Sequence, residues 1–205
     1  MRVGQYILIF FCMVLTQMFL GCGTFDDSSS EVCFVGDSIT RFWDLEHDFP
    51  ESKINKHAVP GAILEDVAKW SIKDCENNPT VMLIGTNNLA LGMQNDTLTE
   101  NFLNDFVVKY IAQVKELKPS KFYAISILPR NFRHREAYSI NIEIQKFNER
   151  IEAALKNSDI NYKYIDIHEY FLDDDGKIHW DFFTDGLHLS KEGYELMSFK
   201  VRRAL

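Results

Sequence analysis

The sequence has few basic residues for its acidic ones. Its 205 residues include 22 Lys and Arg against 30 Asp and Glu, which gives a formal net charge of −8 at pH 7. Because a nucleic-acid-binding protein needs a basic surface to contact phosphates, this balance argues against a nucleic-acid partner. Internal repeats are missing too, and low complexity is confined to a short serine-rich stretch. The length suits a single globular domain with room for a sizeable core.

Long apolar runs are also scarce, and the one at the N-terminus is short for a membrane span. Residues 6–20, YILIFFCMVLTQMFL, match the length of a signal-peptide core, whereas a span needs about 20 apolar residues. The next letters, FLGC, resemble the bacterial lipobox, although Leu20 stands where that motif usually has a small residue. We expect residues 1–21 to be a lipoprotein-type signal peptide and Cys22 to carry lipid. A plain secretory signal and an uncleaved N-terminal anchor remain alternatives.

This N-terminus sets the expected domain organisation and location. Residues 22–31 contain GTFDDSSS, a small, polar stretch typical of a flexible tether, and residues 32–205 form the expected folded domain. Such a protein is exported and held by lipid at the bacterial cell envelope, on its periplasmic or surface side. Gly23 stands where an aspartate is associated with inner-membrane retention, which favours an outer-membrane location in a host with two membranes.

Cysteine is rare, with four residues in the chain. Cys12 leaves with the predicted signal and Cys22 is assigned to lipid, so only Cys33 and Cys75 belong to the folded domain. An oxidising compartment permits a disulfide between them. However, Cys33 lies in an apolar strand and Cys75 in a polar loop. We therefore expect two unpaired cysteines, with Cys33 as a small core residue.

What the chain does contain is an alternation of short apolar runs and longer amphipathic ones. The apolar runs predict buried strands over 32–36, 80–85, 121–128 and 162–168, and the amphipathic runs predict helices over 61–72, 99–117, 139–157 and 190–205. Pro119 ends the second of these helices, and Ser190 is the expected N-cap of the last. Apolar strands separated by helices predict an α/β fold with a parallel sheet covered on both faces.

Polar residues follow the predicted strands at the edge where such sheets form their sites. Ser38 follows the first strand in CFVGDSIT, GTNN (85–88) follows the second and PRN (129–131) follows the third. Alone, Ser38 is more readily a turn or N-cap serine than a nucleophile. A nucleophilic serine needs a base and an acid that orients it. His188 in DGLHLS, with Asp185 three residues earlier, supplies this pair, unless it is an ordinary solvent-facing turn.

A serine that attacks a carbonyl also needs donors for the oxyanion. Three candidates present themselves, namely the backbone N–H of Ser38, the backbone N–H of Gly61 and the side-chain amide of Asn87. A glycine permits the close approach of backbone to ligand that this role requires. The alternatives are that Asn87 caps a strand end and that Gly61 merely begins a helix.

Taken together, four blocks resemble the SGNH, or GDSL-type, hydrolases, in the order of that family. They are GDSIT, the Pro60–Gly61 step, GTNN and DGLHL, and the resemblance spans about residues 32–200. SILPR (126–130) and FLDDDGKIHWDFFTDGLHLSKEGY further resemble the branch of the platelet-activating-factor acetylhydrolase catalytic subunits. Asn88 departs from the third block, which often ends in aspartate.

The resemblance implies a flavodoxin-like three-layer α/β/α fold with no cofactor and no metal. It assigns Ser38 as nucleophile, His188 as base and Asp185 as the group that orients it, with Ser38, Gly61 and Asn87 forming the oxyanion hole. The sequence itself also argues against a metal site, since no histidine pair shows metal-ligand spacing beside a matching carboxylate helix.

Other residues near the predicted edge remain open or receive ordinary roles. Trp43 is expected in the core rather than as a substrate platform. Arg130, Arg133 and Arg135 are expected to form a solvated basic loop, although they could meet an anionic substrate group. The remaining histidines have no assignment; His57 by default lies on the surface, and His168 could give polar support behind the site.

The sequence therefore predicts a lipid-anchored serine esterase that acts on short-chain esters, acetyl above all, of a carbohydrate or lipid-like alcohol. A lysophospholipase or thioesterase and a sugar O-acetyltransferase would use the same three residues. A non-catalytic binding lipoprotein is the alternative outside enzymes. The oligomeric state stays open.

Overall fold

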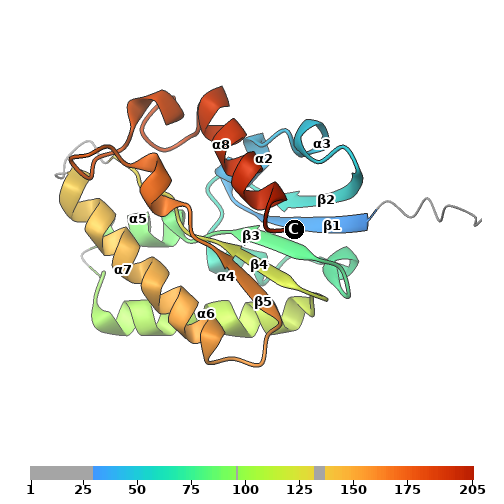
Figure 1. The fold of residues 1–205 in the computed structure, drawn as a ribbon. Coiled ribbons are helices and arrows are strands. Elements are labelled where there is room, and N and C mark those ends of the chain that lie inside the picture. Colours follow the sequence, from blue (N-terminus) through green and yellow to red (C-terminus); the bar gives the residue numbers. More distant parts are fainter. Residues whose placement is uncertain (1–29, 96, 132–136) are drawn as a thin grey trace, which may run out of the picture.

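The fold is built on one parallel sheet. The computed structural model describes residues 30–95, 97–131 and 137–205, so the predicted signal peptide, Cys22 and most of the tether lie outside the described residues. The strands are β1 (Ser30–Gly36), β2 (Ser52–Ala58), β3 (Thr80–Leu83), β4 (Phe122–Ile125) and β5 (Tyr162–Ile165). They pair in the order β2-β1-β3-β4-β5, all parallel (Figure 1). This is the flavodoxin-like order and confirms the predicted architecture.

Helices connect the strands. The α-helices are α2 (Ser38–Phe42), α3 (Leu45–Asp48), α4 (Leu64–Val67), α5 (Thr86–Gln94), α6 (Glu100–Leu117), α7 (Ala137–Lys156) and α8 (Lys191–Arg202). Three short 3₁₀ turns, η1 (Lys73–Cys75), η2 (His168–Phe171) and η3 (Trp180–Phe182), lie in the loops. The described residues include no helix that is both long and apolar enough to cross a membrane.

The sheet is covered on both faces, because successive side chains of a strand point to opposite sides. In β1, Val32 and Phe34 pack with α2, α3 and α8, whereas Cys33 and Val35 pack with α4 to α7. Figure 1 shows these two groups of helices on opposite sides of the sheet. The result is the predicted three-layer arrangement, with a core on each face.

The long amphipathic helices begin and end close to where the sequence predicts. Thr99 caps α6 by accepting the N–H of Phe102, and the helix ends at Leu117, two residues before Pro119. Ser190 caps α8 by accepting the N–H of Gly193 at 3.1 Å, as predicted. These boundaries depend on local side-chain chemistry, which the sequence shows directly.

One predicted element is wrong, and one strand was not predicted. The helix expected over 61–72 is reduced to the four residues of α4, because the chain turns soon afterwards toward η1. The sequence also misses β2, SKINKHA, whose side chains are mostly half-buried. As an edge strand with two lysines and a histidine, β2 lacks the continuous apolar run that marks the other strands.

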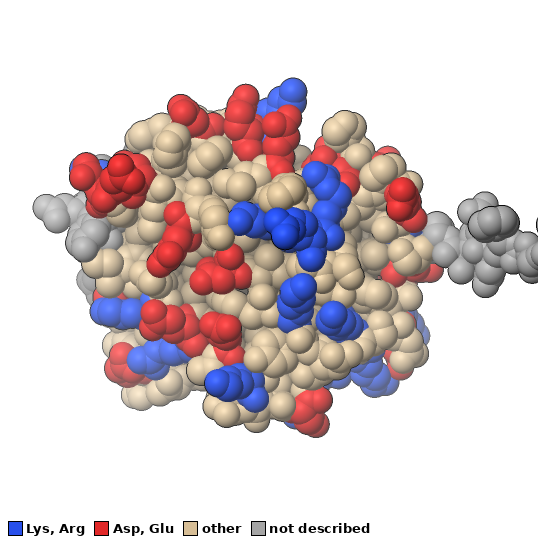
Figure 2. Space-filling model, viewed as in Figure 1, with Lys and Arg blue, Asp and Glu red and all other residues tan. Residues whose placement is uncertain are grey.

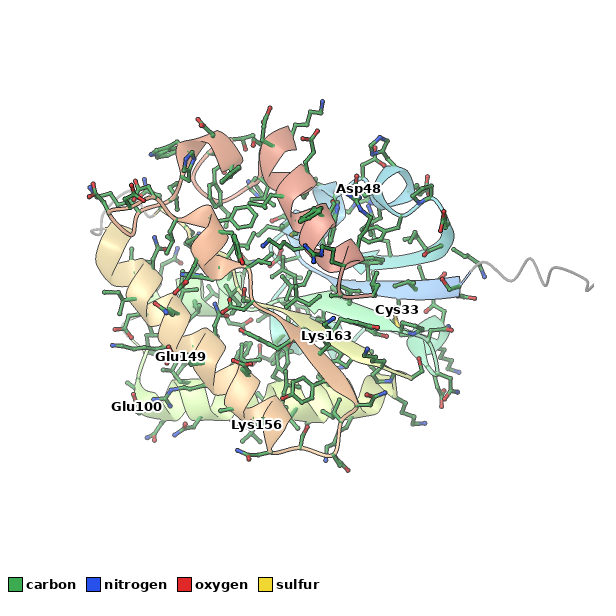
Figure 3. All side chains as sticks on the ribbon, viewed as in Figure 1. Cys33, Asp48, Glu100, Glu149, Lys156 and Lys163 are labelled. Atoms are coloured by element: carbon green, nitrogen blue, oxygen red, sulfur yellow. A yellow bond between two sulfur atoms is a disulfide. The ribbon has the colours of Figure 1, made fainter. Side chains whose placement is uncertain are left out.

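The cysteines of the domain form a disulfide, so the expectation that they stay unpaired is wrong. Cys33 of β1 and Cys75 of η1 are bonded, with Cα atoms 5.3 Å apart and a sequence separation of 42 (Figure 3). Cys75 has polar neighbours in the sequence, yet its own side chain is fully buried. Asp74 is held beside β2, where its carbonyl accepts from Asn55 and its carboxylate contacts His57. These contacts turn η1 inward beneath β1.

On one face of the molecule, side chains of opposite charge lie near one another (Figure 2). Figure 2 shows acidic and basic side chains interspersed on the face that carries α8 and β5. Intermixed charge of both signs is typical of a water-exposed surface.

Candidate active site

Ser38 lies where β1 ends and α2 begins. Gly36 allows this turn because a Cβ there would come within 2.2 Å of Thr40 Oγ1 and 2.5 Å of the Leu83 carbonyl. Asp37 then caps α2, its Oδ1 accepting the N–H of Ile39 at 3.0 Å. The serine thus occupies the first position of a helix, at the carboxyl edge of the sheet.

A histidine from the far end of the chain meets this serine. Ser38 Oγ and His188 Nε2 are 3.0 Å apart, although 150 positions separate them in the sequence. On the other side of the ring, His188 Nδ1 lies 2.7 Å from Asp185 Oδ2. Since a carboxylate only accepts, Nδ1 carries the hydrogen and Nε2 is free to accept from the serine hydroxyl. The structure brings Ser38, His188 and Asp185 into one hydrogen-bonded line.

The turn that carries the histidine is held by its own aspartate. Asp185 Oδ1 accepts the backbone N–H groups of Leu187 at 3.0 Å and His188 at 2.7 Å, while Gly186 adopts a positive φ of 84°. Burial alone would raise the pKa of Asp185, but these bonds and the contact with the His188 ring lower it to about 2. Asp185 is therefore ionised at neutral pH.

The predicted oxyanion donors lie on neighbouring segments of the same edge. Gly36, Ala58 and Leu83 are register partners on β1, β2 and β3, so Ser38, Gly61 and Asn87 all follow aligned strand ends. Gly61 has a φ of 79°, which favours glycine. Asn87 Nδ2 donates to the Ala62 carbonyl at 2.9 Å, and this bond ties the Asn87 segment to the Gly61 segment.

The residue that departs from the family pattern has a role next to this segment. Asn88 is buried, accepts the N–H of Leu64 at 3.0 Å through Oδ1, and donates to Glu65 Oε2 at 2.8 Å through Nδ2. Asn88 therefore anchors α5 to α4, directly beside Asn87. An aspartate could not supply the donor that Glu65 accepts.

The arginine of SILPR is not in a solvated loop, contrary to the prediction. Arg130 is 9% exposed, and its Nη1 donates to Thr86 Oγ1 at 3.0 Å and to the Thr86 carbonyl at 3.1 Å. Arg133 and Arg135 lie outside the described residues. The polar neighbours of Arg130 in the sequence suggest that it is exposed. Its side chain is instead buried against the start of α5, where it binds Thr86.

Sequence reasoning also missed Asp37 as a site residue. Its carboxyl group is fully buried next to Ser38, and Oδ2 has no partner among the described residues. Burial raises the pKa of Asp37 to about 6, against the opposing effects of the Ile39 N–H, His188 and Arg130. The signal in the sequence was its place directly before Ser38 at the end of an apolar strand.

The remaining aromatic and histidine candidates are settled by their contacts. Trp43 is a core residue, as expected, packing against Phe34 and Phe49. His168 is buried behind the sheet edge, its Nδ1 lying 2.9 Å from the Ile127 carbonyl, which is a polar support role. His57 contacts Asp74.

One group in the described part of the chain has metal-ligating side chains close together. The potential ligand atoms of Cys33, His57 and Cys75 lie within 4.8 Å of one another. Zinc and similar ions bind cysteine as the thiolate, whereas these two sulfur atoms are joined in the disulfide. The residues present therefore do not fit a metal.

Comparisons with known proteins agree with this geometry. The profile of the GDSL-like lipase/acylhydrolase family matches residues 34–196. Among solved structures, a GDSL-like lipase from Bacteroides thetaiotaomicron is 22% identical, with a TM-score of 0.69 over 86% of this chain and 87% of that one. A Streptococcus pneumonia protein described as a platelet activating factor is 19% identical, with a TM-score of 0.65 over 99% of both chains.

An acetyl xylan esterase from Geobacillus stearothermophilus is similar as well, at 13% identity and a TM-score of 0.63 over 86% of this chain and 94% of that one. At these identities the structures share the fold. No curated protein matches the chain.

Proposed function

The chain belongs to the GDSL-like lipase/acylhydrolase family and is a serine ester hydrolase, and we propose that it removes short acyl groups, acetyl above all, from a carbohydrate or lipid-like alcohol through an acyl intermediate on Ser38. The observation that carries this proposal is the line of hydrogen bonds from Asp185 through His188 to the Ser38 hydroxyl. Each member of that line is oriented by the next, as nucleophilic catalysis requires.

In the first half of the reaction, Ser38 Oγ attacks the ester carbonyl and its proton passes to His188 Nε2. The new C–O bond forms as the carbonyl π bond breaks, which leaves a tetrahedral intermediate with a negative oxygen. His188 is then a cation, and ionised Asp185 at 2.7 Å stabilises that charge. Collapse of the intermediate breaks the bond to the alcohol, which takes the proton from His188, and leaves acyl-Ser38.

The oxyanion is proposed to bind three N–H groups. Ser38 is the first residue of α2, where backbone N–H groups have no partner within the helix. The left-handed conformation of Gly61 presents the second N–H. Asn87 uses one amide hydrogen on the Ala62 carbonyl, and its second amide hydrogen supplies the third donor.

In the second half, a water molecule replaces the alcohol. His188 Nε2 removes its proton as the water oxygen attacks the acyl carbonyl, and the same donors stabilise the second tetrahedral intermediate. The proton returns to Ser38 Oγ as its bond to the acyl carbon breaks. The products are the free acid and the original enzyme.

Two observations support a short acyl group on a larger alcohol. The acetyl xylan esterase among the structural neighbours is named for that class of bond. Phe42, 57% exposed, lies with its ring centroid 5.4 Å from that of His188 and offers an apolar contact beside the base. Because His188 delivers its proton to the alcohol, Phe42 is placed to contact that alcohol.

The test uses residues 23–205 with p-nitrophenyl esters from acetyl to octanoyl. We expect the highest kcat/KM on acetate, a burst of p-nitrophenol as acyl-Ser38 accumulates, and a loss of at least about 10³-fold in Ser38→Ala. Ser158→Ala, a serine on the loop after α7, serves as the matched control and should behave like the unchanged enzyme.

Other outcomes would redirect the proposal. An optimum at octanoyl would indicate a lysophospholipase or thioesterase. Acetyl transfer to an added sugar that exceeds hydrolysis would indicate an O-acetyltransferase. Turnover that survives in Ser38→Ala would overturn the role of Ser38.

A further inference from the structure

Arg130 is a charged side chain in an enclosed position, and nothing in the proposed chemistry uses it. It lies in the loop between β4 and α7 and is 9% exposed. Burial lowers the pKa of Arg130 to about 10, yet the guanidinium remains a cation at neutral pH. Enclosing a charge is costly unless hydrogen bonds and opposite charges compensate for the lost water. The compensating groups therefore show what the side chain does.

The hydrogen bonds of the guanidinium hold the start of α5. Nη1 donates to both oxygen atoms of Thr86, the residue that opens this helix. On one side of Thr86 stands Gly85, with a φ of 126°, and on the other stands Asn87. A glycine leaves the backbone free to take several conformations. The two bonds to Thr86 restrict the first turn from which the Asn87 amide projects.

The backbone next to Arg130 holds the turn of the base. The N–H of Asn131 donates to the Gly186 carbonyl at 2.8 Å. The two segments are in direct contact, since a Cβ on Gly186 would lie 3.1 Å from Asn131 Cβ. Gly186 stands between Asp185 and His188. The loop itself is fastened to α7, because the Arg130 N–H donates to Asn141 Oδ1 at 3.0 Å.

The charge of Arg130 faces the site from the same position. Asp37 and Asp185 both favour its cationic form, and the cation in turn favours the ionised form of buried Asp37. One of these carboxylates precedes the serine and the other orients the histidine. Arg130 thus offsets negative charge on both sides of the contact between Ser38 and His188.

We propose that Arg130 is a positioning residue that couples the oxyanion segment at Thr86–Asn87 to the base turn at Asp185–His188. It acts through these neighbours and does not touch the substrate. The inference rests on the proposed function, because it assigns Arg130 to the relative placement of a donor and a base that both act on one intermediate. An error of about 1 Å in such a placement can reduce turnover about 10²-fold.

The experiment compares Arg130→Lys and Arg130→Met with the unchanged enzyme on p-nitrophenyl acetate. Lysine keeps the charge, but its side chain ends one atom short of the position of Nη1, the nitrogen that makes both bonds to Thr86, and methionine keeps only the apolar stem. We expect kcat to fall about 10-fold in Arg130→Lys and about 10²-fold in Arg130→Met, with KM within about twofold. Arg150→Met, which removes an arginine of α7 that binds Asn104 and Glu100, should leave both constants unchanged.

A second readout separates positioning from a merely structural role. An alkyl boronic acid forms a tetrahedral adduct with a nucleophilic serine, and its negative oxygen needs the same donors as the intermediate. If Arg130 positions the donor and the base, the affinity for this probe falls in step with kcat in folded Arg130→Lys, whose thermal unfolding is recorded alongside. The proposal is overturned if kcat and probe affinity of Arg130→Lys stay within twofold, or if activity is lost only in proportion to unfolded protein.

Failure of the proposed function would look different. In that case the unchanged enzyme shows no turnover that depends on Ser38, so there is no kcat with which Arg130→Lys can be compared. When the unchanged enzyme is active through Ser38, the kinetics of Arg130→Lys test Arg130 alone, even if Arg130→Met does not fold.

Discussion

Two aspartates flank the contact between Ser38 and His188, and the protein treats them in opposite ways. Asp37 is fully buried, and burial raises its pKa to about 6. The side chain of Asp185 is 54% exposed, and although burial works against it, the hydrogen bonds from His188 and Leu187 lower its pKa to about 2. One carboxyl group is close to losing its charge at neutral pH, while the other keeps it.

The difference follows from what each turn has to do. The Asp37 turn must direct β1 into α2, and a single accepted N–H from Ile39 suffices for that. In the proposed reaction, the Asp185 turn must hold a histidine that becomes a cation, which requires a charged partner. Solvent and three N–H donors keep Asp185 ionised. The same residue type therefore serves a structural role when enclosed and an electrostatic role when open.

The largest expected effect comes from removing the charge of the open aspartate. Asp185→Asn keeps the shape of the side chain but lacks the negative charge that stabilises cationic His188 and selects its tautomer. We expect kcat on p-nitrophenyl acetate to fall by about 10²- to 10⁴-fold, with thermal unfolding nearly unchanged because the group is exposed. Asp181→Asn, an exposed carboxylate on η3, is the control. A loss smaller than tenfold would contradict the role of Asp185.

The same substitution at the enclosed aspartate should act on stability instead. Asp37→Asn keeps the oxygen that caps Ile39. Since the folded pKa of about 6 lies above the ordinary value of 3.8, Asp37 contributes stability that is fully present below pH 3.8 and is lost as the pH rises through 6. The difference of about 2 pKa units corresponds to at most about 3 kcal/mol.

Urea unfolding at pH 3.5 and pH 8 tests this expectation. The two proteins should be equally stable at pH 3.5, and Asp37→Asn should be the more stable at pH 8. A variant that is less stable than the unchanged protein at both pH values would show that the Asp37 carboxylate is favourable where it stands.

The smallest expected effect concerns the backbone of the open turn. Gly186→Ala places a Cβ at a φ of 84° and 3.1 Å from Asn131 Cβ. We expect a loss of about 1–2 kcal/mol in unfolding free energy and a several-fold lower kcat, because the turn carries His188. Gly176→Ala has a similar φ of 72° but lies outside the site. Gly176→Ala should lower the unfolding free energy without lowering kcat. If Gly176→Ala and Gly186→Ala lose kcat equally, the loss does not come from the turn that carries His188, and this prediction is wrong.

The two aspartates also show how much of the site can be predicted from the sequence. Ser38, Asp185 and His188 could be placed in one site because each lies in a short motif, and the parallel sheet predicts that loops after its strands share an edge. The buried state of Asp37 and Arg130 could not be predicted. Charged residue types are rarely buried, and the burial of Arg130 depends on a segment more than 40 positions away, at Thr86.

The disulfide and the edge strand were missed for the same reason. Cys75 is surrounded by polar letters, yet contacts from Asn55 and His57 of β2 turn its segment inward toward Cys33. β2 itself has no apolar run, and it forms a strand because β1 offers a free edge along its whole length.

By itself, the sequence determined four of the strands, the extent of α6, the cap of α8, and the chemical groups available for the reaction. These depend on residues within a few positions of one another. Only the tertiary structure decided that Ser38 and His188 stand 3.0 Å apart, that Cys33 and Cys75 bond, and that Arg130 is enclosed between the two halves of the site. These features arise from packing between segments that are distant in the sequence. Burial there changes the charge and solvent exposure of a side chain, and its neighbours in the sequence do not indicate that change.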